Sequence, residues 1–380
     1  GMEHYVDGTL TMDHHEVCTL TGMYNAEGEG HIDADMTLSR TPLLLLDGFV
    51  PDRIINFLGY AEGNVKVRGT LSHPDVNGEL YFDSAYVASE PYGVMMRLCD
   101  DQLAIKNSRM QLENFQMFAR NNNALTLYGY VDFANFDQMT AYIRMRADNY
   151  LLIDSKEQAR SEAYGKAYVN FLGLVDGPLD ALRMRGRLDV LGSSDITYIL
   201  RDSPLSTDNQ LDGLVKFVNF RKPETVSVER PPINGLNMDL TVNIDDGAHA
   251  LCALNTDKSN YVDLVGGGNL RMLYTGNDGL SLYGRYTIAS GEMKYSLPVI
   301  PLKTFNIKDG SYVEFSGDPM NPRLNITATE ENKTTVSTDG GSGRSVMFEC
   351  GVEITKTLQD MGLQFIIDAP DDQQMHNELM

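Results

Sequence analysis

The chain has 380 residues, 42% of them hydrophobic, and this balance excludes a disordered polar chain. Its net charge of −22, from 31 basic and 53 acidic residues, excludes nucleic acid as a partner, because phosphate neutralisation needs clustered Lys and Arg. The same charge disfavours adhesion to anionic membranes, and the densest apolar run, Leu43 to Leu46, is far shorter than the roughly 18 residues of a membrane helix.

One strand-like sequence motif recurs along the chain. Apolar residues alternate with other residues on both sides of a glycine, and five copies are centred on Gly22, Gly69, Gly129, Gly186 and Gly284. A period of two is typical of a strand with one apolar and one polar face. Residues 240–244 and 269–273 repeat the pattern in weaker form. Such repeats predict a stacked or solenoid-like β architecture rather than one closed core.

Glycine on the apolar face of a strand needs a reason, because it packs nothing and costs backbone entropy. One interpretation is a bend or strong twist of the sheet at each glycine. The other is a site where something other than a side chain fills the inner face. Both interpretations fit a sheet that curls along its length.

Helices are expected at only a few places. Residues 51–58 begin with Pro51 and carry apolar residues in helical spacing, which predicts about two turns. Residues 193–202 are a weaker candidate, with a Ser or Asp cap and a stop before Pro204. Residues 155–163 are charged and form a helix or a loop. A last helix is expected to follow Asp371-Asp372.

Proline-rich and polar segments predict the connections. Residues 203–209 and 222–234 are expected to be linkers, with a boundary near 205–235. The polar, Gly-rich residues 330–344 predict a mobile hairpin tip. We therefore divide the chain into N-terminal repeats, a middle repeat with its linker, and a C-terminal β domain, over residues 1–150, 151–235 and 236–380.

Residues for catalysis, metal binding or a cofactor do not form a recognisable site. The cysteines at 18, 99, 252 and 350 are far apart and contain no C-x-x-C, so we interpret them as small apolar residues. His14 and His15 are strand neighbours and point to opposite faces, which disfavours a metal site. The triple glycine before Asn269 lacks the third glycine of a dinucleotide loop. We expect no catalytic residue, no metal and no cofactor.

The stretch from Leu280 to Ala328 is the most regular part of the chain. An Asp-Gly pair tolerates positive φ at both central positions of a type I′ turn, so a hairpin is predicted between residues 305–308 and 311–315. Four alternating runs predict an antiparallel meander. These runs are divided by Gly291, Asp309-Gly310, and the pair Pro319 and Pro322.

The sequence of this stretch resembles the C-terminal domain of the TamB family, large AsmA-like proteins of the Gram-negative cell envelope. The segments that carry the resemblance are PLK at 301–303, GSYVEFSGDP at 310–319 and NPRLNITA at 321–328. The resemblance is specific from about Gly165 to Met380 and looser upstream. It implies a mostly β fold: an elongated, curled, antiparallel-rich sheet, shaped as a half-pipe with an apolar inner face and a few short helices.

The resemblance also implies a function that is not enzymatic. Members are periplasmic, carry an N-terminal inner-membrane anchor, and meet an outer-membrane partner of the TamA class or the barrel-assembly machinery. The implied role is a conduit for phospholipid between the two membranes, help in assembling outer-membrane proteins, or both. Gly1 before Met2 resembles the remnant of a removed tag, so we expect a fragment. The sequence departs from the family in lacking the anchor and the final stretch and in carrying a polar insertion near 331–345.

The inward residues of the repeats are the candidate site. Strands with one apolar face must bury that face against another sheet or offer it to a ligand, and each buried CH₂ of an acyl chain contributes about 0.8 kcal/mol. The groove lining for phospholipid or other apolar cargo is therefore expected to include Val65, Val67, Leu125, Leu127, Leu182, Met184, Leu282, Ile288, Val313, Phe315, Leu324 and Ile326.

Two other functions fit the same pattern. An adhesive β-solenoid would bind glycan or protein on its polar face, and Tyr128 and Tyr283, which share the same outward position in their repeats, favour it mildly. A chaperone for unfolded β-barrel strands would use open sheet edges. An exposed apolar trough would favour the conduit, whereas a closed two-sheet sandwich would favour adhesion.

Overall fold

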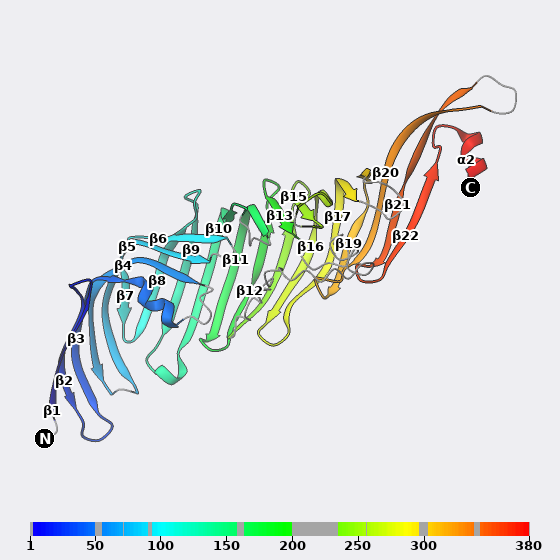
Figure 1. Cartoon of the computed structure of the whole chain (residues 1–380). Helices are drawn as coiled ribbons and strands as arrows, with labels where there is room; N and C mark the ends of the chain where they lie inside the picture. Colours follow the sequence, from blue (N-terminus) through cyan, green and yellow to red (C-terminus); the bar gives the residue numbers. More distant parts are fainter. Residues whose placement is uncertain are drawn as a thin grey trace, which may run out of the picture.

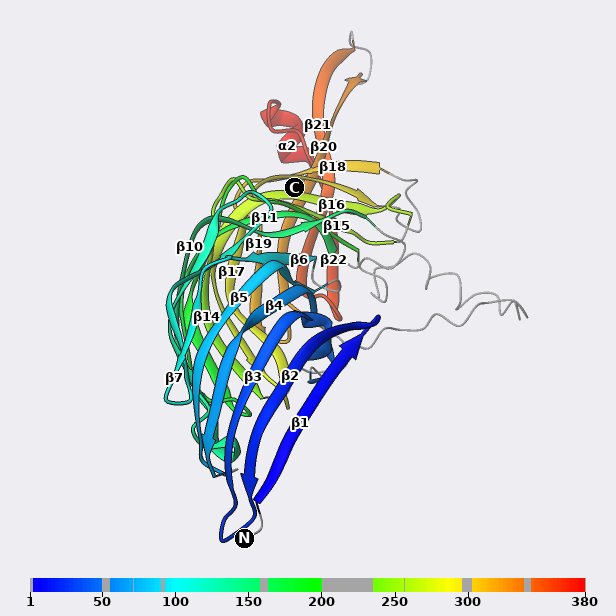
Figure 2. The same ribbon diagram turned by 90° about the vertical axis from the view of Figure 1, so that its left-hand side faces the viewer.

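The computed structural model describes residues 3–49, 55–70, 72–89, 93–157, 163–199, 235–255, 257–295, 303–337 and 343–379. Most of these residues belong to one 22-stranded sheet, so the predicted mostly β fold is confirmed. The strands follow one another along an elongated body, with the two termini at opposite ends (Figure 1). The strands are themselves curved, so the sheet arches around one side (Figure 2).

The first ten strands follow the chain along the sheet, with β6 and β7 sharing one position between β5 and β8, and their pairings are antiparallel. They are β1 (Glu3–Met12), β2 (His15–Asn25), β3 (His31–Pro42), β4 (Asn56–Gly69), β5 (Pro74–Ser89), β6 (Val94–Leu98), β7 (Leu103–Lys106), β8 (Arg109–Phe118), β9 (Ala124–Asp132) and β10 (Thr140–Ser155).

The sheet continues with twelve further strands. They are β11 (Ala163–Pro178), β12 (Leu182–Val190), β13 (Asp195–Ile199), β14 (Leu236–Ile244), β15 (His249–Ala253), β16 (Tyr261–Thr275), β17 (Gly279–Tyr295), β18 (Lys303–Ile307), β19 (Tyr312–Gly317), β20 (Arg323–Val336), β21 (Arg344–Thr357) and β22 (Met361–Asp368). The helical elements are η1 (Leu43–Phe49), η3 (Phe136–Gln138) and α2 (Gln373–Leu379), and α2 confirms the helix expected near the C-terminus.

Several positions in the sheet hold two short strands end to end in place of one long strand. β6 and β7 pair with successive parts of β5, and β18 and β19 pair with successive parts of β17. β12 and β13 do the same along β11, and β14 and β15 along β16. β12 pairs with β14, and β13 pairs with β15, both in parallel. The pairings among the six strands from β11 to β16 therefore form a closed ring within the large sheet.

The predicted hairpin at Asp309-Gly310 is wrong. The flanking strands, β18 and β19, both run antiparallel to β17, so the chain turns a corner within one strand position and does not reverse. Gly310 has φ of 85°, but Asp309 does not adopt positive φ, which excludes a type I′ turn. Gly291, expected to separate two runs, lies inside β17. An Asp-Gly pair between alternating runs marks an interruption but not its direction.

Two predicted helices are wrong where the structure describes them. Residues 56–58 begin β4, and residues 195–199 form β13. β13 has strand partners on both sides, β11 and β15, so hydrogen bonding within the sheet outweighs a weak helix cap. The other predicted residues at 51–54, 158–162, 200–234 and 338–342 lie outside the described residues. The domain division remains a prediction.

The recurrent glycines allow neighbouring backbones to approach closely. A Cβ on Gly129, whose φ is 143°, would lie 1.9 Å from the carbonyl oxygen of Tyr142. On Gly284, with φ of 120°, it would lie 2.3 Å from that of Asn269. Both values are far inside a van der Waals contact, and positive φ favours glycine. The adjacent strand therefore fills the space, which favours the interpretation of these glycines as sites of bending.

Candidate functional site: the apolar face of the sheet

Alternate residues of each strand make one face of the sheet apolar. The strand register aligns them: Val65 of β4 lies opposite Met36 of β3, and Leu127 of β9 opposite Met145 of β10. Repeated from strand to strand, this alignment gathers apolar side chains into six clusters along the sheet. We call this surface the apolar face.

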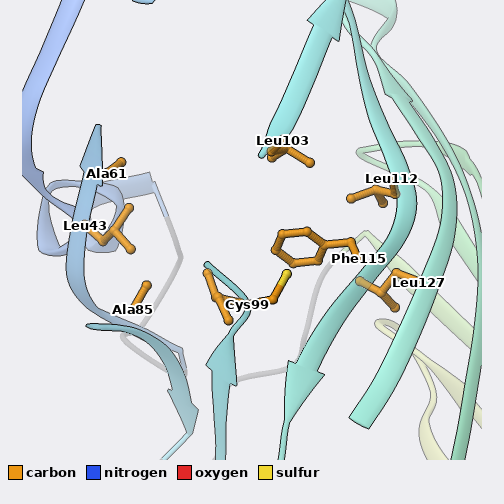
Figure 3. Packing of buried hydrophobic residues seen from close by; sticks show 9 residues of the cluster. Leu43, Ala61, Ala85, Cys99, Leu103, Leu112, Phe115 and Leu127 are labelled. Carbon is orange, nitrogen blue, oxygen red and sulfur yellow. The ribbon is translucent and has the colours of Figure 1, made fainter. Parts of the chain in front are cut away.

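The N-terminal cluster forms where β4 to β9 meet η1. Leu43 of η1 is only 6% exposed and lies with the small side chains of Ala61 and Ala85, while Phe115 and Leu127 complete the cluster from β8 and β9 (Figure 3). The side chains of Phe82 and Phe115 meet edge to face, with ring centroids 6.1 Å apart. A short helix thus covers part of the apolar face at this point.

The helix η1 was not predicted from the sequence. Four consecutive leucines, residues 43–46, follow Pro42, and such a run cannot alternate between the two faces of a strand. That break in the period of two was the available signal. It indicates an element that leaves the sheet, although it does not say that the element returns to lie on the apolar face.

The predicted lining residues all lie on the apolar face, as the strand alternation and register place them. The buried ones are Val65, Leu127, Ile288, Leu324 and Ile326. Five more are half-buried members of the clusters: Val67, Leu125, Met184, Val313 and Phe315. Leu182 and Leu282 are half-buried and stand outside the clusters. The structure brings these residues to one surface, and whether they contact cargo stays a prediction.

Two tyrosine hydroxyl groups are buried in these clusters without a hydrogen-bond partner among the described residues. They belong to Tyr150 of β10 and Tyr286 of β17. Burial alone raises the pKa of Tyr286 to about 12 and also raises that of Tyr150. Both groups therefore stay neutral and add no charge to the apolar face.

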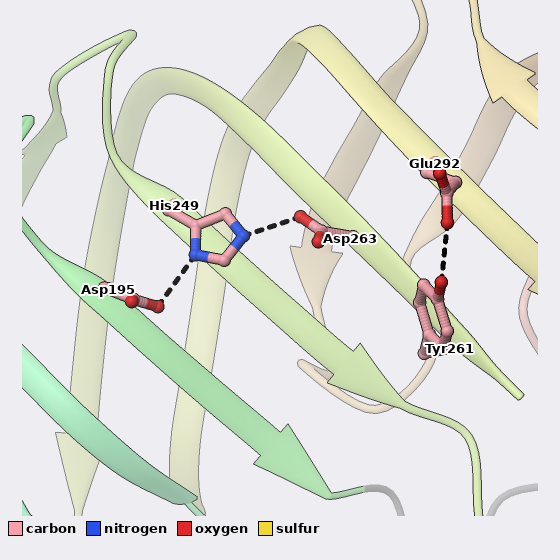
Figure 4. A network of polar contacts seen from close by, with 5 residues as sticks. All are labelled: Asp195, His249, Tyr261, Asp263 and Glu292. Atoms are coloured by element: carbon pink, nitrogen blue, oxygen red, sulfur yellow. Dashed lines mark hydrogen bonds and ion pairs between the residues drawn. The ribbon is translucent and has the colours of Figure 1, made fainter. Parts of the chain in front are cut away.

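The opposite face carries paired charges. The ring of His249 on β15 bridges two carboxylates, with Nδ1 2.7 Å from Asp195 of β13 and Nε2 2.6 Å from Asp263 of β16 (Figure 4). Beside it, the hydroxyl of Tyr261 donates to Glu292 at 2.5 Å. This network joins β13 and β15, which pair in parallel, to β16. The network was not predicted from the sequence, because its members are far apart in the chain.

Exposed aromatic and apolar side chains also occur on the opposite face. Tyr128 and Tyr283 are each 42% exposed, and Leu172 of β11 is 65% exposed. Tyr128 donates its hydroxyl proton to Asn114 at 2.8 Å. The predicted outward position of the two tyrosines is confirmed.

The described residues contain no group of three His, Cys, Asp or Glu side chains that could hold a metal ion. The four cysteines are free thiols. Within the described ranges, every helix falls short of the length and apolarity needed to cross a membrane.

These features define the class: a β protein built from one curved sheet, apolar along one face and charged on the other. The family described as the TamB C-terminal domain matches residues 113–379, and the chain belongs to the TamB family. That family is generally one of transport and assembly proteins that are not enzymes. The match begins at residue 113, upstream of Gly165, the residue from which the resemblance in the sequence is specific. A comparison with curated proteins finds no match.

Proposed function

We propose that this chain forms part of a TamB-type conduit, a half-pipe whose apolar face carries phospholipid between the inner and outer membranes across the periplasm. The observation that supports it most is the series of apolar clusters along one face of a single sheet. An acyl chain on that face would gain about 0.8 kcal/mol for each buried CH₂ without any directed hydrogen bond.

The central cluster is the stretch best suited to contact cargo. Leu240, Val242 and Leu270 are buried there, while seven neighbours are only half-buried: Phe171, Met184, Leu188, Val190, Ile244, Met272 and Phe315. Half-buried apolar side chains on a sheet face gain further burial when a ligand covers them. The full-length protein would be anchored in the inner membrane and meet an outer-membrane partner of the TamA class.

The test is to compare lipid carried through purification by two variants of matched chemistry. Met184→Asp places a carboxylate on the apolar face, whereas Leu172→Asp places one on the opposite face of the neighbouring strand β11, three residues along from Val175, the partner of Met184. Mass spectrometry should detect phospholipid with the parent chain and with Leu172→Asp, and little or none with Met184→Asp. Equal lipid content in the two folded variants would contradict the proposal.

A role in assembling outer-membrane β-barrels is a second candidate, and one edge of the sheet favours it. β22 pairs with β21 alone among the described strands, and on it Leu363, Phe365 and Ile367 are 46%, 60% and 54% exposed. An open edge with apolar side chains on one face can accept an added strand. In this case Phe365→Lys should weaken cross-linking to an unfolded barrel protein while lipid content stays unchanged.

A further inference from the structure

Two leucines of β11 lie on the face of the sheet opposite to the apolar face, near the middle of the elongated body (Figure 1). Leu172 is 65% exposed and Leu174 is half-buried. Phe171, the residue before them, packs against two of the apolar clusters, so strand alternation turns both leucines to the opposite side. A single exposed leucine is ordinary on a protein surface. These two differ because charged residues surround them in a regular order.

Arginines flank both leucines on the two neighbouring strands. In the strand register, each leucine lies between an arginine of β10 and an arginine of β12. All four of these arginines are exposed, and the residues next to them in their own strands face the apolar clusters. We call the whole group the arginine-leucine patch. It consists of two rows across the three strands: Arg146, Leu172 and Arg187 in one row, and Arg144, Leu174 and Arg185 in the next.

The patch is basic although the chain is strongly acidic. The strand segments that contain it, residues 142–148, 170–176 and 183–189, hold five arginines and three aspartates. The whole chain has 31 basic and 53 acidic residues. The local excess of positive charge therefore runs against the rest of the chain and favours an acidic partner.

Carboxylates of the same surface neutralise the arginines only in part. Asp176 lies 3.1 Å from Arg185 but is shared with a second arginine. Arg146 and Arg187 each pair with one aspartate, yet their side chains are still 70% and 64% exposed. Arg144 has no carboxylate partner within the described ranges. Guanidinium groups exposed in this way keep N–H groups that can bind a further carboxylate.

The composition of the patch is typical of a protein interface, with an apolar centre inside a polar rim. Tyr128 extends it toward β9, because it lies opposite Arg144 in the strand register and is 42% exposed. Arg and Tyr are enriched among the residues that provide most of the binding energy of protein interfaces. The surface therefore fits another protein better than a small molecule.

We propose that the arginine-leucine patch binds an acidic amphipathic helix of a partner protein. Two leucines one turn apart on such a helix are separated by about 6 Å along its axis, and Leu172 and Leu174 are separated by about 6.8 Å along β11. The arginines of β10 and β12 are two strand spacings apart, about 9.6 Å, which is close to the helix diameter of roughly 10 Å. Glutamates on both sides of the leucine stripe then meet the arginines, while the stripe covers the two leucines.

The experiment measures binding of two fluorescein-labelled peptides to the full chain by fluorescence anisotropy. Both are alanine-rich helices of about five turns with one leucine stripe; the first has glutamates on both sides of the stripe, and the second has glutamine at those positions. The parent should bind the glutamate peptide at least about fivefold more tightly. Arg146→Gln/Arg187→Gln should weaken that binding about three- to tenfold.

Arg40→Gln/Arg68→Gln is the matched control. It also removes two exposed arginines that pair with aspartates, Asp83 and Asp33, but these lie on β3 to β5, far from the patch in the sheet. This variant should bind the glutamate peptide as the parent does. Equal losses in the two double variants would mean unspecific attraction between charges and would overturn the assignment.

Two further variants separate this surface from the lipid conduit on the other face. Leu172→Asp should abolish peptide binding while phospholipid still co-purifies, and Met184→Asp should retain peptide binding while lipid is lost. A parent chain that does not bind the glutamate peptide, or binds both peptides equally, would overturn the assignment and leave the conduit standing. Binding of phosphatidylglycerol vesicles in place of the peptide, if Arg146→Gln/Arg187→Gln abolishes it, would overturn it in favour of an anionic membrane.

Discussion

The central and C-terminal clusters are built from the same alternating pattern but differ in how deeply they are buried. The central cluster has three buried and seven half-buried members. The C-terminal cluster has nine buried and five half-buried members, and Ile288 and Ala328 within it are 0% exposed. One region of the apolar face is therefore open and the other is closed.

Both regions contain positions where two short strands lie end to end, so such a corner does not by itself account for the difference. In the C-terminal region β18 and β19 meet at a corner, and both strands hydrogen bond to β17 and β20. Side chains from the two arms, such as Phe305 and Ile307 of β18, then face those of β20 and β21 in one cluster. In the central region the long strands β11 and β16 flank the parallel pairs. Alternation alone thus defines an apolar face without determining whether it closes.

Shortening one side chain in each region should give the largest difference. Ile288→Ala removes buried atoms from a closed cluster and should lower the free energy of unfolding by about 2–5 kcal/mol. Met184→Ala should lower it by about 1 kcal/mol or less, because Met184 is half-buried on the open stretch. Urea titrations followed by circular dichroism would measure both. Similar losses would mean that the central region is as closed as the C-terminal one.

Much of the fold was predictable from the sequence, because alternation is a local property. The inward positions of Leu127, Met184 and Ile326 follow from a period of two, and the structure places all three on the apolar face. Whether a turn residue reverses the chain depends on which strand offers the next hydrogen bonds. Asp309-Gly310 was therefore misassigned, although the interruption itself was detected.

The parts of the site that were not predictable depend on contacts between distant residues. η1 reaches the apolar face because Ala61 and Ala85 leave room for Leu43, and those three residues belong to different elements. In the charge network, His249 of β15 joins Asp195 of β13 to Asp263. β13 and β15 pair in parallel although they are far apart in the sequence. Neither arrangement has a signature in any single stretch of sequence.

Substituting two glycines tests whether the close approach of neighbouring strands matters for stability. One glycine lies inside the sheet and the other on its edge strand. Gly129→Ala forces a Cβ to within 1.9 Å of a backbone oxygen at φ of 143° and should cost about 1–3 kcal/mol of stability. Gly8→Ala on the edge strand β1, where nothing lies within 4 Å of the added atom, should be neutral or slightly stabilising. Thermal unfolding of both variants measures this, and a neutral Gly129→Ala would show that the neighbouring strand can move aside.

The smallest effect is expected at the network that joins the strands between the open and closed regions. Burial lowers the pKa of His249, but the hydrogen bonds that its ring donates to the carboxylates of Asp195 and Asp263 outweigh it, and the pKa is raised above its ordinary value of 6.5. Lys166 of β11 lies opposite Asp195, and Glu292 of β17 lies opposite Asp263, so the strand partners of the two carboxylates add one cation and one anion beside the network. The protonated ring therefore links β13, β15 and β16 through two ion pairs.

The sign of the pH dependence follows from the raised pKa. A raised pKa in the folded state stabilises the fold fully below the unfolded pKa near 6.5, and that stabilisation is lost as the pH rises through the folded pKa. The His249 side chain is 32% exposed, so screening limits the effect to about 1 kcal/mol or less. An NMR titration of the ring should give the raised pKa, and hydrogen exchange of β13 and β15 should quicken beyond the intrinsic pH effect above it. His249→Asn should remove that excess dependence, and if the dependence persists in this variant, the two regions are joined by other contacts.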